Sequence, residues 1–366
     1  MRRLLVTGGA GFIGANFVRH WRSNYPADRV VVLDALTYAG NRVSLPAEEA
    51  AAFRFVHGDI RDRSLVARLL REEGICTLVH FAAESHVDRS IRGPAAFVDT
   101  NVGGTLSLLE AAREVWLDAA GGPRKHRFHH VSTDEVFGSL GAEDPPFCET
   151  TPYAPNSPYA ASKAASDHLV RAWHRTYGLD ITISNCSNNY GPYHFPEKLI
   201  PLTIVNLLEG RPLPIYGDGR QVRDWLFVED HCRAVEAALL RGQSGETYAV
   251  GGDSERSNIE VVRTLCRLID QAFAVDPDLA RRYPKSPAMR GGSAASITYV
   301  RDRPGHDRRY AVDTGKISTD LSFSPSITLE DGLRQTLAWY LANESWWRGV
   351  MDGSYRDWIG LNYAVA

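Results

Sequence analysis

The sequence predicts an α/β fold, with a doubly wound parallel sheet and a smaller C-terminal α/β lobe. Apolar runs alternate with stretches of helical spacing as far as about residue 187, and a glycine-rich turn follows the first of these runs. Beyond that point proline and glycine become frequent. Strands that alternate with helices form parallel sheets, because each parallel connection needs a crossover. We therefore expect one domain over residues 1–187 and mainly a second lobe over residues 188–366. Some strands and helices of the lobe are expected to return to the first domain.

The first domain should begin with a strand, a helix and a second strand. Residues 4–7 are apolar, residues 12–21 have apolar side chains at helical spacing, and residues 30–33 are apolar again. The intervening helix provides the right-handed crossover that a parallel pair requires. This unit is typical of a Rossmann-like sheet. The same alternation predicts further strands at residues 53–57, 77–81, 127–131 and 181–185, and helices at residues 64–71, 94–116 and 159–177.

The second half should mix short strands with helices. Strands are expected at residues 213–216 and 247–250, and helices at residues 229–240, 259–274, 314–321 and 328–343. Residues 275–296 are polar and rich in proline, glycine and serine, so that we expect a surface insertion there.

The composition is that of an ordinary globular protein. The chain has 366 residues, of which 44% are hydrophobic, and a net charge of −3 without a basic block, so that no nucleic-acid surface is indicated. Its five cysteines are scattered and form no C-x-x-C pair, which favours reduced thiols over disulfides or zinc. The N-terminus is too short for a signal peptide, and no apolar run reaches membrane-spanning length. We therefore expect a cytoplasmic protein.

The glycine-rich turn has the spacing of a dinucleotide site. Gly8-x-x-Gly11-x-x-Gly14 lies between the first strand and the first helix, where it permits a tight turn and close approach of a pyrophosphate to the helix N-terminus. Asp34 ends the next strand, 20 residues after Gly14, where a carboxylate can hold the ribose diol of adenosine. Because Asp34 would repel a 2′-phosphate, the sequence favours NAD over NADP.

Strand ends and the helix that follows them supply further candidate cofactor contacts. Small residues after the fourth strand let a cofactor lie close, and a carboxylate after the third suits the adenine ring. Ordinary packing is the alternative for most of them. The candidates are Phe12, Ile13, Leu36, Thr37, Asp59, Ile60, Phe81, Ala82, Ala83, Thr100 and Asn189, together with Tyr159 and Lys163.

Tyr159 and Lys163 are four residues apart on an expected helix and therefore share one face. A lysine ammonium beside a phenol favours the phenolate, as does a positive nicotinamide ring. Such a phenolate can take a proton from a hydroxyl while hydride leaves the same carbon.

Two adjacent carboxylates, Asp134 and Glu135, follow the strand expected at residues 127–131, next to the hydroxyl of Thr133. A solvated acidic turn is one interpretation of this stretch. The other is acid–base chemistry, because two carboxyl groups in one desolvated site favour a protonated and an ionised member.

These motifs together resemble the extended short-chain dehydrogenase/reductase family, which acts on nucleotide sugars. Within it, Ser-Thr-Asp-Glu-Val-Phe-Gly at residues 132–138 is similar to the dTDP-glucose 4,6-dehydratases, as are residues 83–90 and 303–310. The resemblance extends from Arg3 to about Tyr363, apart from residues 275–296. Phe137 stands where that family often has tyrosine, a change that we expect to be neutral.

The resemblance implies a role for each residue of the centre. Tyr159, helped by Lys163 and Thr133, would deprotonate the 4-hydroxyl of dTDP-glucose as carbon 4 passes hydride to NAD. Glu135 would remove the proton on carbon 5 and Asp134 would protonate the departing 6-hydroxyl. Hydride then returns to carbon 6, which gives the 4-keto-6-deoxy sugar nucleotide and unchanged NAD.

The substrate is expected to contact residues from both halves of the chain. Ser85 and Asn188 would face the glucosyl or diphosphate portion, and Arg223 would bind the diphosphate, since a guanidinium fork matches phosphate oxygens. A surface arginine or a capping asparagine is the structural alternative. The remaining candidates are Thr133, Lys198, Leu199, Pro214, Tyr216, Asn258, Arg303 and His306.

Histidines 126, 129 and 130 flank a strand start, and we interpret them as solvated side chains rather than metal ligands. The resemblance also implies a homodimer, in which the helices beginning near Pro94 and Tyr159 form a four-helix bundle. Four apolar residues are compatible with that bundle and equally with packing on the sheet, namely Leu106, Leu109, Leu169 and Trp173.

Three other functions compete with dehydration. A UDP-hexose 4-epimerase or a nucleotide-linked uronate decarboxylase would use Tyr159 and Lys163 but would not need Asp134 and Glu135. A non-catalytic NAD-sensing protein would need none of the four. The residues leave open whether the base is thymine, and whether the product enters cell-wall rhamnose or the deoxysugars of secondary metabolites.

Overall fold

The computed structural model describes residues 1–46, 53–122 and 125–351, and a seven-stranded sheet is its central feature. Every neighbouring pair of strands in this sheet is parallel. The strands lie in the order β10 (Thr247–Val250), β6 (Ile181–Cys186), β5 (Arg127–Thr133), β4 (Thr77–His80), β1 (Arg3–Thr7), β2 (Arg29–Asp34) and β3 (Phe53–His57). The Rossmann-like α/β fold predicted from the sequence is confirmed.

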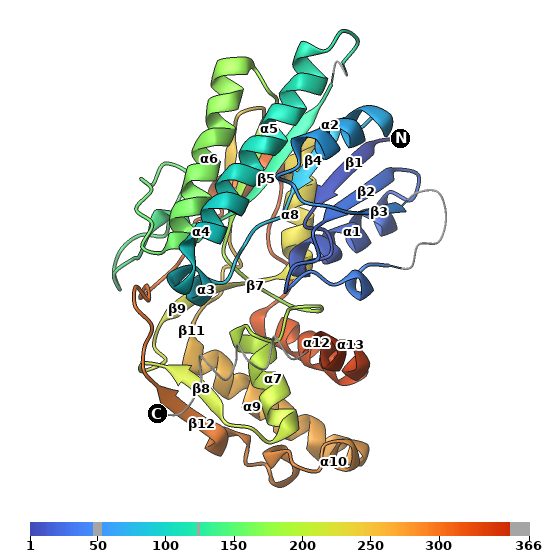
Figure 1. Cartoon of the computed structure of the whole chain (residues 1–366). Helices are drawn as coiled ribbons and strands as arrows, with labels where there is room; N and C mark the ends of the chain where they lie inside the picture. Colours follow the sequence, from blue (N-terminus) through green and yellow to red (C-terminus); the bar gives the residue numbers. More distant parts are fainter. Residues whose placement is uncertain (47–52, 123–124, 352–366) are drawn as a thin grey trace.

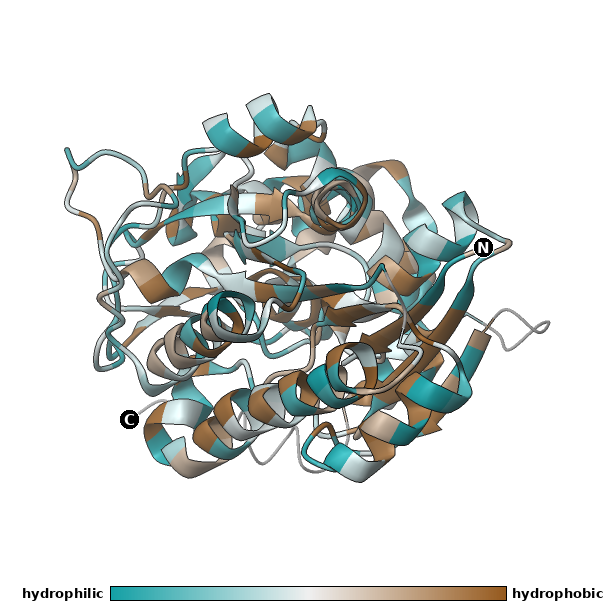
Figure 2. Ribbon diagram, turned by 90° about the horizontal axis from the view of Figure 1, so that it is seen from above, coloured by the Kyte–Doolittle hydropathy of each residue, from teal (hydrophilic) through white to brown (hydrophobic). Residues whose placement is uncertain are grey.

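Helices cover both faces of the sheet because its strands bury side chains on both sides (Figure 1). Leu4 and Val6 of β1 belong to the apolar cluster under α1 (Phe12–Asn24) and α8 (Val228–Arg241). Leu5, which points the other way, belongs to the cluster under α2 (Arg63–Glu72), α5 (Thr105–Arg113) and α6 (Pro158–Tyr177). The helices in Figure 2 carry both brown and teal residues, as expected of elements with one buried face.

The helix expected at residues 94–116 is present but not uniform. It comprises α4 (Pro94–Phe97), a π-helical segment (Val98–Gly104), α5, and a second π-helical segment (Glu114–Asp118). The short helix α3 (Val87–Arg92), which precedes it, was not predicted.

The second half of the chain forms a smaller lobe, which lies below the sheet in Figure 1. It contains two small sheets, β11 (Glu255–Ser257), β9 (Val222–Phe227) and β7 (Asn188–Tyr190), and β12 (Ile297–Val300) with β8 (Leu213–Tyr216). Its helices are α7 (Leu199–Glu209), α9 (Asn258–Val275), α10 (Pro277–Arg282), α12 (Leu329–Ala342) and α13 (Glu344–Val350). Three elements of this half belong to the large sheet or pack against it, namely β10, α8 and α11 (Gly315–Leu321).

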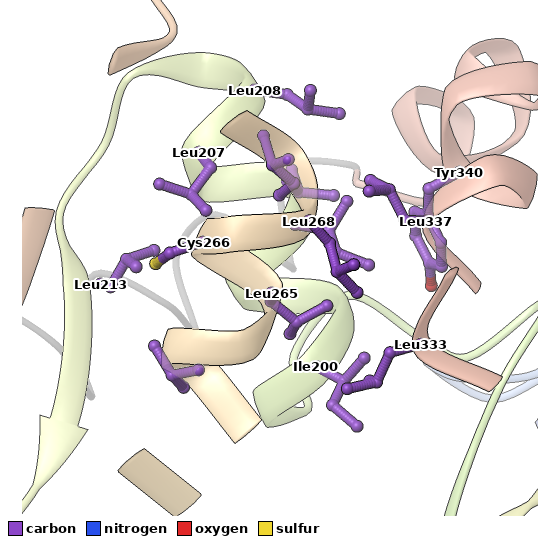
Figure 3. Close-up of a cluster of buried hydrophobic side chains, with 14 of the residues drawn as sticks. Ile200, Leu207, Leu208, Leu213, Leu265, Cys266, Leu268, Leu333, Leu337 and Tyr340 are labelled. Atoms are coloured by element: carbon purple, nitrogen blue, oxygen red, sulfur yellow. The ribbon is translucent and has the colours of Figure 1, made fainter. Parts of the chain in front are cut away.

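The core of the lobe is formed by side chains from α7, α9 and α12 (Figure 3). Leu265 and Leu268 of α9 lie between Leu207 of α7 and Leu337 of α12, and all four are at least 95% buried. A capping box formed by Ser257 and Glu260 fixes the start of α9, the helix on which this core is built.

Residues 275–296 lie largely at the surface, as their composition suggests, since most of their side chains are exposed. They are nevertheless folded into α10 and two 3₁₀ turns, and Leu279, Tyr283 and Ala288 are buried in the lobe core. The hydroxyl of Tyr283 donates a hydrogen bond to Glu344 of α13. Three apolar side chains among many polar ones are therefore enough to anchor this segment to the lobe.

Over the described ranges, no helix combines the length and the apolar character needed to cross a membrane. Of the second lobe expected over residues 188–366, the last fifteen residues (352–366) lie outside the described residues.

Candidate active site

A cavity of about 670 Å³ opens at the carboxyl ends of the strands of the large sheet. It lies where the strand order reverses between β1 and β4, the position at which open α/β sheets bind ligands. The segments that follow β1 to β6 line one side of it, and residues 194–200 of the smaller lobe line another. The cavity therefore lies between the two halves of the chain.

The glycine turn forms one wall of this cavity. Gly8 has a φ of +69°, and a Cβ on Gly14 would lie 2.2 Å from the carbonyl oxygen of Gly8, so that no larger residue fits either position without a shift of the backbone. Helix α1 starts after Gly11 without a side-chain cap. Phe12, Ile13 and Gly14 line the cavity at this uncapped N-terminus, which suits a pyrophosphate.

Asp34, at the end of β2, is buried and lines the same cavity. Its Oδ2 accepts a hydrogen bond from the Ala10 amide at 2.9 Å and its Oδ1 one from the Leu36 amide at 2.8 Å. Burial raises the pKa of Asp34, and these two hydrogen bonds oppose that rise. Each carboxylate oxygen retains a further lone pair, so that the residues present fit the ribose diol of NAD.

All the other predicted cofactor residues line the cavity except Leu36. Leu36 instead contributes its backbone amide and adopts a φ of 49°. Asn101, beside Thr100, accepts a hydrogen bond from the Glu84 amide at 2.8 Å and donates to Ser162 on α6 at 2.8 Å. It thereby ties the segment after β4 to the helices. The predicted residues that line the cavity are Thr37, Asp59, Ile60, Phe81, Ala82, Ala83, Thr100, Tyr159, Lys163 and Asn189.

The two adjacent carboxylates lie on a 3₁₀ turn (Asp134–Phe137), because β5 extends two residues further than predicted, to Thr133. Thr133 caps this turn: its hydroxyl accepts a hydrogen bond from the Glu135 amide at 3.2 Å and donates one to Asp134 Oδ1 at 3.3 Å. All three residues line the cavity. The acidic stretch is therefore a buried part of the site and not a solvated turn.

The surroundings of the two carboxyl groups differ in charge. Burial, followed by the neighbouring Glu135 carboxylate, raises the pKa of Asp134 well above its usual value. Burial also raises the pKa of Glu135, but the Arg303, Arg223 and Lys198 cations oppose that rise. Asp134 Oδ2 is buried without a hydrogen-bond partner among the described residues. The environment thus favours a neutral Asp134 beside an ionised Glu135.

Helix α6 brings Tyr159 and Lys163 to the cavity. Pro158 is its first residue and the Ser157 hydroxyl caps it at the Ala160 amide, so that Tyr159 lies in the first turn. Burial and the Glu135 carboxylate raise the pKa of Tyr159 well above 10, whereas a hydrogen bond with Thr133 lowers it. In the protein alone the phenol is therefore protonated.

A buried network of polar side chains holds the ammonium group of Lys163 in place. Its Nζ donates to the carbonyl of Val131 at 2.9 Å and lies 3.3 Å from His130 Nε2, which in turn lies 3.2 Å from Asp167 Oδ1. The other oxygen of Asp167 accepts hydrogen bonds from Tyr153 and Asn185. These contacts fix the ammonium group at the floor of the cavity.

Burial lowers the pKa of Lys163 to about 8, against the attraction of Asp167. Burial lowers the pKa of His130 to about 4. For Asp167 burial acts upward, but the hydrogen bond and charge of His130 and the charge of Lys163 bring its pKa to about 2.

The interpretation of the histidines as solvated was wrong for two of them. His129 and His130 are fully buried in β5, because central strands of this sheet are covered on both faces, whereas His126 is half-buried. Across the described part of the chain, no three histidine, cysteine or acidic side chains are grouped as a metal site would need.

Four of the predicted substrate residues outside the catalytic group line the cavity, namely Ser85, Asn188, Lys198 and Leu199. Lys198 Nζ donates to the carbonyl of Ser85 at 3.2 Å, and Asn188 Oδ1 is buried without a hydrogen-bond partner within the described ranges. The other six are not in its lining: Pro214, Tyr216, Arg223, Asn258, Arg303 and His306.

Three of these six residues, Tyr216, Arg303 and His306, lie together near Asp88. Tyr216 donates to Asp88 at 3.1 Å, Arg303 lies 3.3 Å from the same carboxylate, and the rings of Tyr216 and His306 are 6.1 Å apart. Arg303 is close enough to Glu135 to lower its pKa, so that this cluster borders the catalytic turn.

Arg223 is more enclosed than a free phosphate ligand would be. It is 4% exposed, its two terminal nitrogens donate to the carbonyls of Val222 and Asp307, and its guanidinium lies 4.1 Å from the ring centre of Tyr310. In the protein alone its charge acts on Asp134 and Glu135, whose pKa values it lowers.

Several residues of the cavity wall were not predicted. Glu197 is 3% exposed and is paired with Arg89 at 3.2 Å, and His194 is stacked on Phe12 at 4.1 Å. Their only sequence signal is their position within four residues of Lys198. Glu84 and Ser132 also line the cavity, and both lie in motifs that carry the family resemblance although neither was singled out as a site residue. Four lining residues have no sequence signal, namely Cys186, Ser187, Phe195 and Trp225.

Comparison with known proteins gives one consistent result. A family model described as GDP-mannose 4,6 dehydratase matches residues 5–336. A dTDP-glucose 4,6-dehydratase of Xanthomonas campestris pv. campestris (strain B100) is 58% identical over 358 residues, which cover 97% of this chain and 98% of that protein.

Solved structures agree. DesIV, a dTDP-glucose 4,6-dehydratase from Streptomyces venezuelae crystallised with NAD and TYD bound, superposes with a TM-score of 0.82 at 49% identity, over 95% of this chain and 99% of that one. A UDP-glucose 4-epimerase of Thermotoga maritima with UDP-glucose is more distant, with a TM-score of 0.77 at 27% identity, over 93% and 99% of the two chains.

Proposed function

The chain belongs to the GDP-mannose 4,6 dehydratase family, and from this premise we propose that it converts dTDP-glucose into dTDP-4-keto-6-deoxyglucose with NAD as a resident cofactor. The observation that carries the proposal is the pair of a buried Asp134 and a half-buried Glu135, which line the cavity together with Tyr159 at the switch point of the sheet. A dehydratase needs an acid and a base in addition to the tyrosine that deprotonates the 4-hydroxyl, and the pair supplies both.

The cofactor would be held by the glycine turn at its pyrophosphate and by Asp34 at its ribose. When bound, NAD accepts a hydride from carbon 4 and later returns it to carbon 6, so that it is unchanged overall. Because Asp34 is a buried carboxylate that would face a 2′-phosphate, NAD fits this site better than NADP.

Tyr159 is the proposed base at the 4-hydroxyl. Its pKa is raised by burial and by Glu135, so that the phenolate needs positive charge beside it. Lys163, fixed on the cavity floor by Val131 and His130, supplies one such charge. The Thr133 hydroxyl supplies a hydrogen bond that acts in the same direction.

The two carboxyl groups then divide the elimination between them. The 4-ketone acidifies the proton on carbon 5, and the ionised Glu135 removes it. Asp134, which its surroundings keep protonated, donates to the departing 6-hydroxyl, so that water is formed. If Asp134 were the base and Glu135 the acid, the negative charge would have to lie on Asp134, whose surroundings raise its pKa well above the usual value.

Residues from both halves of the chain are proposed to bind the substrate. Ser85, Asn188, Lys198 and Leu199 line the cavity directly, and Asn188 has a buried oxygen that a sugar hydroxyl could satisfy. The cluster that includes Tyr216, Arg303 and His306 is proposed to bind the nucleotide, together with Pro214 and Asn258. Arg223 would reach the diphosphate only after a local rearrangement of its present hydrogen bonds.

The rivals lack a use for the carboxylates. A 4-epimerase or a uronate decarboxylase needs Tyr159 and Lys163 but no acid at carbon 6, and an NAD-sensing protein needs no buried acid–base pair.

The division into residues 1–187 for NAD and mainly 188–366 for the sugar nucleotide remains part of the proposal. So does a cytoplasmic location, which the free cysteines favour.

A homodimer is also proposed, through a four-helix bundle of α5 and α6 with their symmetry mates. Ile91 and Val98, before α5, are exposed apolar residues at 38% and 53%. Leu109 is fully buried against the sheet, whereas Leu106, Leu169 and Trp173 are half-buried. Sedimentation equilibrium should give the mass of two chains, and a monomer at micromolar concentration would contradict this part.

The direct test is incubation of the protein and NAD with dTDP-glucose, with product identified by mass and by the absorbance that a 4-keto-6-deoxy sugar develops in alkali. We expect loss of one water and a 4-ketone. A 4-epimer without loss of water would favour the epimerase. Turnover of another sugar nucleotide but not dTDP-glucose would contradict the substrate assignment.

A further inference from the structure

One wall of the cavity is formed by the connection between β7 and α7, residues 192–198, which we call the strap. A connection lacks the repeated backbone hydrogen bonds of a helix or a strand, so that its position depends on the side chains that contact it. Four residues of the strap line the cavity, namely His194, Phe195, Glu197 and Lys198. The shape of the cavity therefore depends on what holds the strap.

Helix α1 holds the strap from the side of the large sheet. The side-chain amide of Asn16 donates to the carbonyl of Pro192 at 2.9 Å. The ring of His194 is stacked on that of Phe12, with ring centres 4.1 Å apart and an angle of 10° between the planes. Phe12 is the first residue of α1, at the uncapped N-terminus proposed to bind the pyrophosphate. The strap thus closes the cavity beside the proposed cofactor site.

Aromatic side chains of α12 and α13 hold the strap from the side of the smaller lobe. The hydroxyl of Tyr340 on α12 donates to the carbonyl of His194. The ring centre of Tyr193 lies 4.5 Å from that of Trp339 on α12 and 5.6 Å from that of Trp346 on α13. Two helices from a distant part of the sequence therefore support a segment that borders the cavity.

The backbone at the start of the strap is strained. Tyr193 has a φ of 64°, in the left-handed region that bulky side chains rarely adopt. Such a conformation persists only where the surroundings hold it. Around Tyr193 these are the two tryptophan rings and the guanidinium of Arg19 on α1, which lies 4.6 Å from the ring centre. The closed position of the strap therefore depends on contacts from both halves of the chain.

We propose that the strap is a lid that opens for NAD to enter or leave, and that Tyr340 is a positioning residue that keeps it closed. The inference rests on the proposed function, in which the hydride taken from carbon 4 must still be in the cavity when carbon 6 is reduced. Loss of the cofactor between these two steps would leave the sugar unreduced. A lid held from both halves of the chain keeps the cofactor in place for that interval.

Two matched variants test the role of Tyr340. Tyr340→Phe removes the hydroxyl that donates to His194. The control is Tyr190→Phe, because Tyr190 is equally buried and its hydroxyl also donates to a backbone carbonyl, that of Leu329 outside the strap, at 3.3 Å. Each protein is loaded with NAD and freed of the excess by gel filtration, and the NAD that remains bound is measured over time.

Tyr340→Phe should release NAD about twofold to tenfold faster than the unaltered protein, the change expected for one hydrogen bond of ordinary strength. Tyr190→Phe should release it at the normal rate. Asn16→Ala, which removes the hydrogen bond to Pro192 from the other side, should also release NAD faster. Normal release by Tyr340→Phe, or the same acceleration in Tyr190→Phe, would overturn the role of Tyr340.

A second measurement needs no variant. Because the lid closes on the cofactor, bound NAD should in turn stabilise the closed lid. Hydrogen exchange should therefore be slower in a peptide spanning residues 192–198 with NAD than without it, whereas α9 should exchange equally in both forms. Equal exchange of the strap in both forms would overturn the lid and, if product is still formed, leave the proposed function intact. A protein that binds no NAD would contradict both.

Discussion

Replacing Asp167 by asparagine should change the pH dependence of the reaction without changing the shape of the site. Asp167 contacts no cavity residue directly, but it lies 3.2 Å from His130 Nε2, which lies 3.3 Å from Lys163 Nζ. Asparagine keeps the size of the side chain and its hydrogen bond with Tyr153. It removes the negative charge that opposes the loss of the Lys163 proton.

The size of the effect follows from the two contacts. They place the ammonium and the carboxylate no further apart than about 6.5 Å, where the attraction is on the order of 2 kcal/mol at an effective dielectric constant of about 20. That energy corresponds to roughly one to two pKa units. The pKa of Lys163, held at about 8, should therefore fall to between about 6 and 7.

The sign of the pH shift is determined by the role of Lys163. In the proposed mechanism the ammonium is the active form, and it is lost as the pH rises through the pKa of Lys163. The alkaline fall of kcat/KM for dTDP-glucose should thus move to lower pH by roughly one to two units in Asp167→Asn. Other titratable groups that interact with the charge of Lys163 are His80 on β4, His130 on β5 and Cys186 on β6. Tyr159 lies one turn before Lys163 on α6.

Asp180→Asn is a suitable control, because Asp180 pairs with Arg127 at 3.1 Å and has no contact with Lys163. It should leave the pH profile unchanged, and Asp167→Glu should retain most of the normal profile. An Asp167→Asn enzyme that binds NAD normally and has an unshifted alkaline limb would refute the reasoning about Lys163.

Three further predictions concern the cofactor site and the lobe. A Cβ on Gly14 would lie 2.2 Å from a carbonyl oxygen of its own turn, so that Gly14→Ala should lose bound NAD and lower the free energy of unfolding by about 1–3 kcal/mol. The control is Gly349→Ala, because a Cβ there would have no atom within 4 Å, and this variant should match the unaltered protein in thermal unfolding. Asp34→Asn should raise the Kd for NAD by roughly tenfold to a hundredfold in calorimetric titration, because the charged acceptor is lost; an unchanged Kd would exclude a ribose contact. Tyr283→Ala should cost about 3–5 kcal/mol in denaturant unfolding and the exposed Met289→Ala less than about 0.5, and equal effects would mean that the segment is not part of the core.

Much of the fold was predictable because its signals are local. The glycine turn, Asp34 and the Tyr159–Lys163 spacing each depend on a few residues whose geometry is set by one strand or one helix. The alternation of apolar runs gave all seven strands of the large sheet, to within two residues at each end. The features of the fold that could not be predicted depend on contacts between residues far apart in the sequence.

Three examples show the limit. Helix α7 was not predicted, since Pro201 lies within it, yet the helix is buried along its whole length apart from its ends. Strand β5 continues through Ser132 and Thr133, which look like loop residues until the neighbouring strand β6 pairs with them. Tyr283 appears in a polar, proline-rich segment and is buried only because α9 and α13 leave a place for it.

The site shows the same division. The residues proposed to bind the cofactor and to act on the reacting carbons were predicted from motifs. The contacts of His130, Asp167 and Glu197 were not predicted, because their partners come from distant parts of the chain. His130 illustrates the point: a histidine in a strand has no sequence feature that distinguishes a solvated ring from one buried between a lysine and a carboxylate.

The measurement that most directly tests the central claim uses Glu135→Gln with dTDP-glucose in deuterated water. Glutamine keeps the shape of the side chain but cannot remove the proton from carbon 5. We expect this variant to reduce its bound NAD, because Tyr159 and Lys163 are intact, while carbon 5 takes up no solvent deuterium and no water is lost. Normal incorporation of deuterium at carbon 5 would contradict the assignment of Glu135 as the base, and with it the claim that the carboxylate pair specifies the reaction.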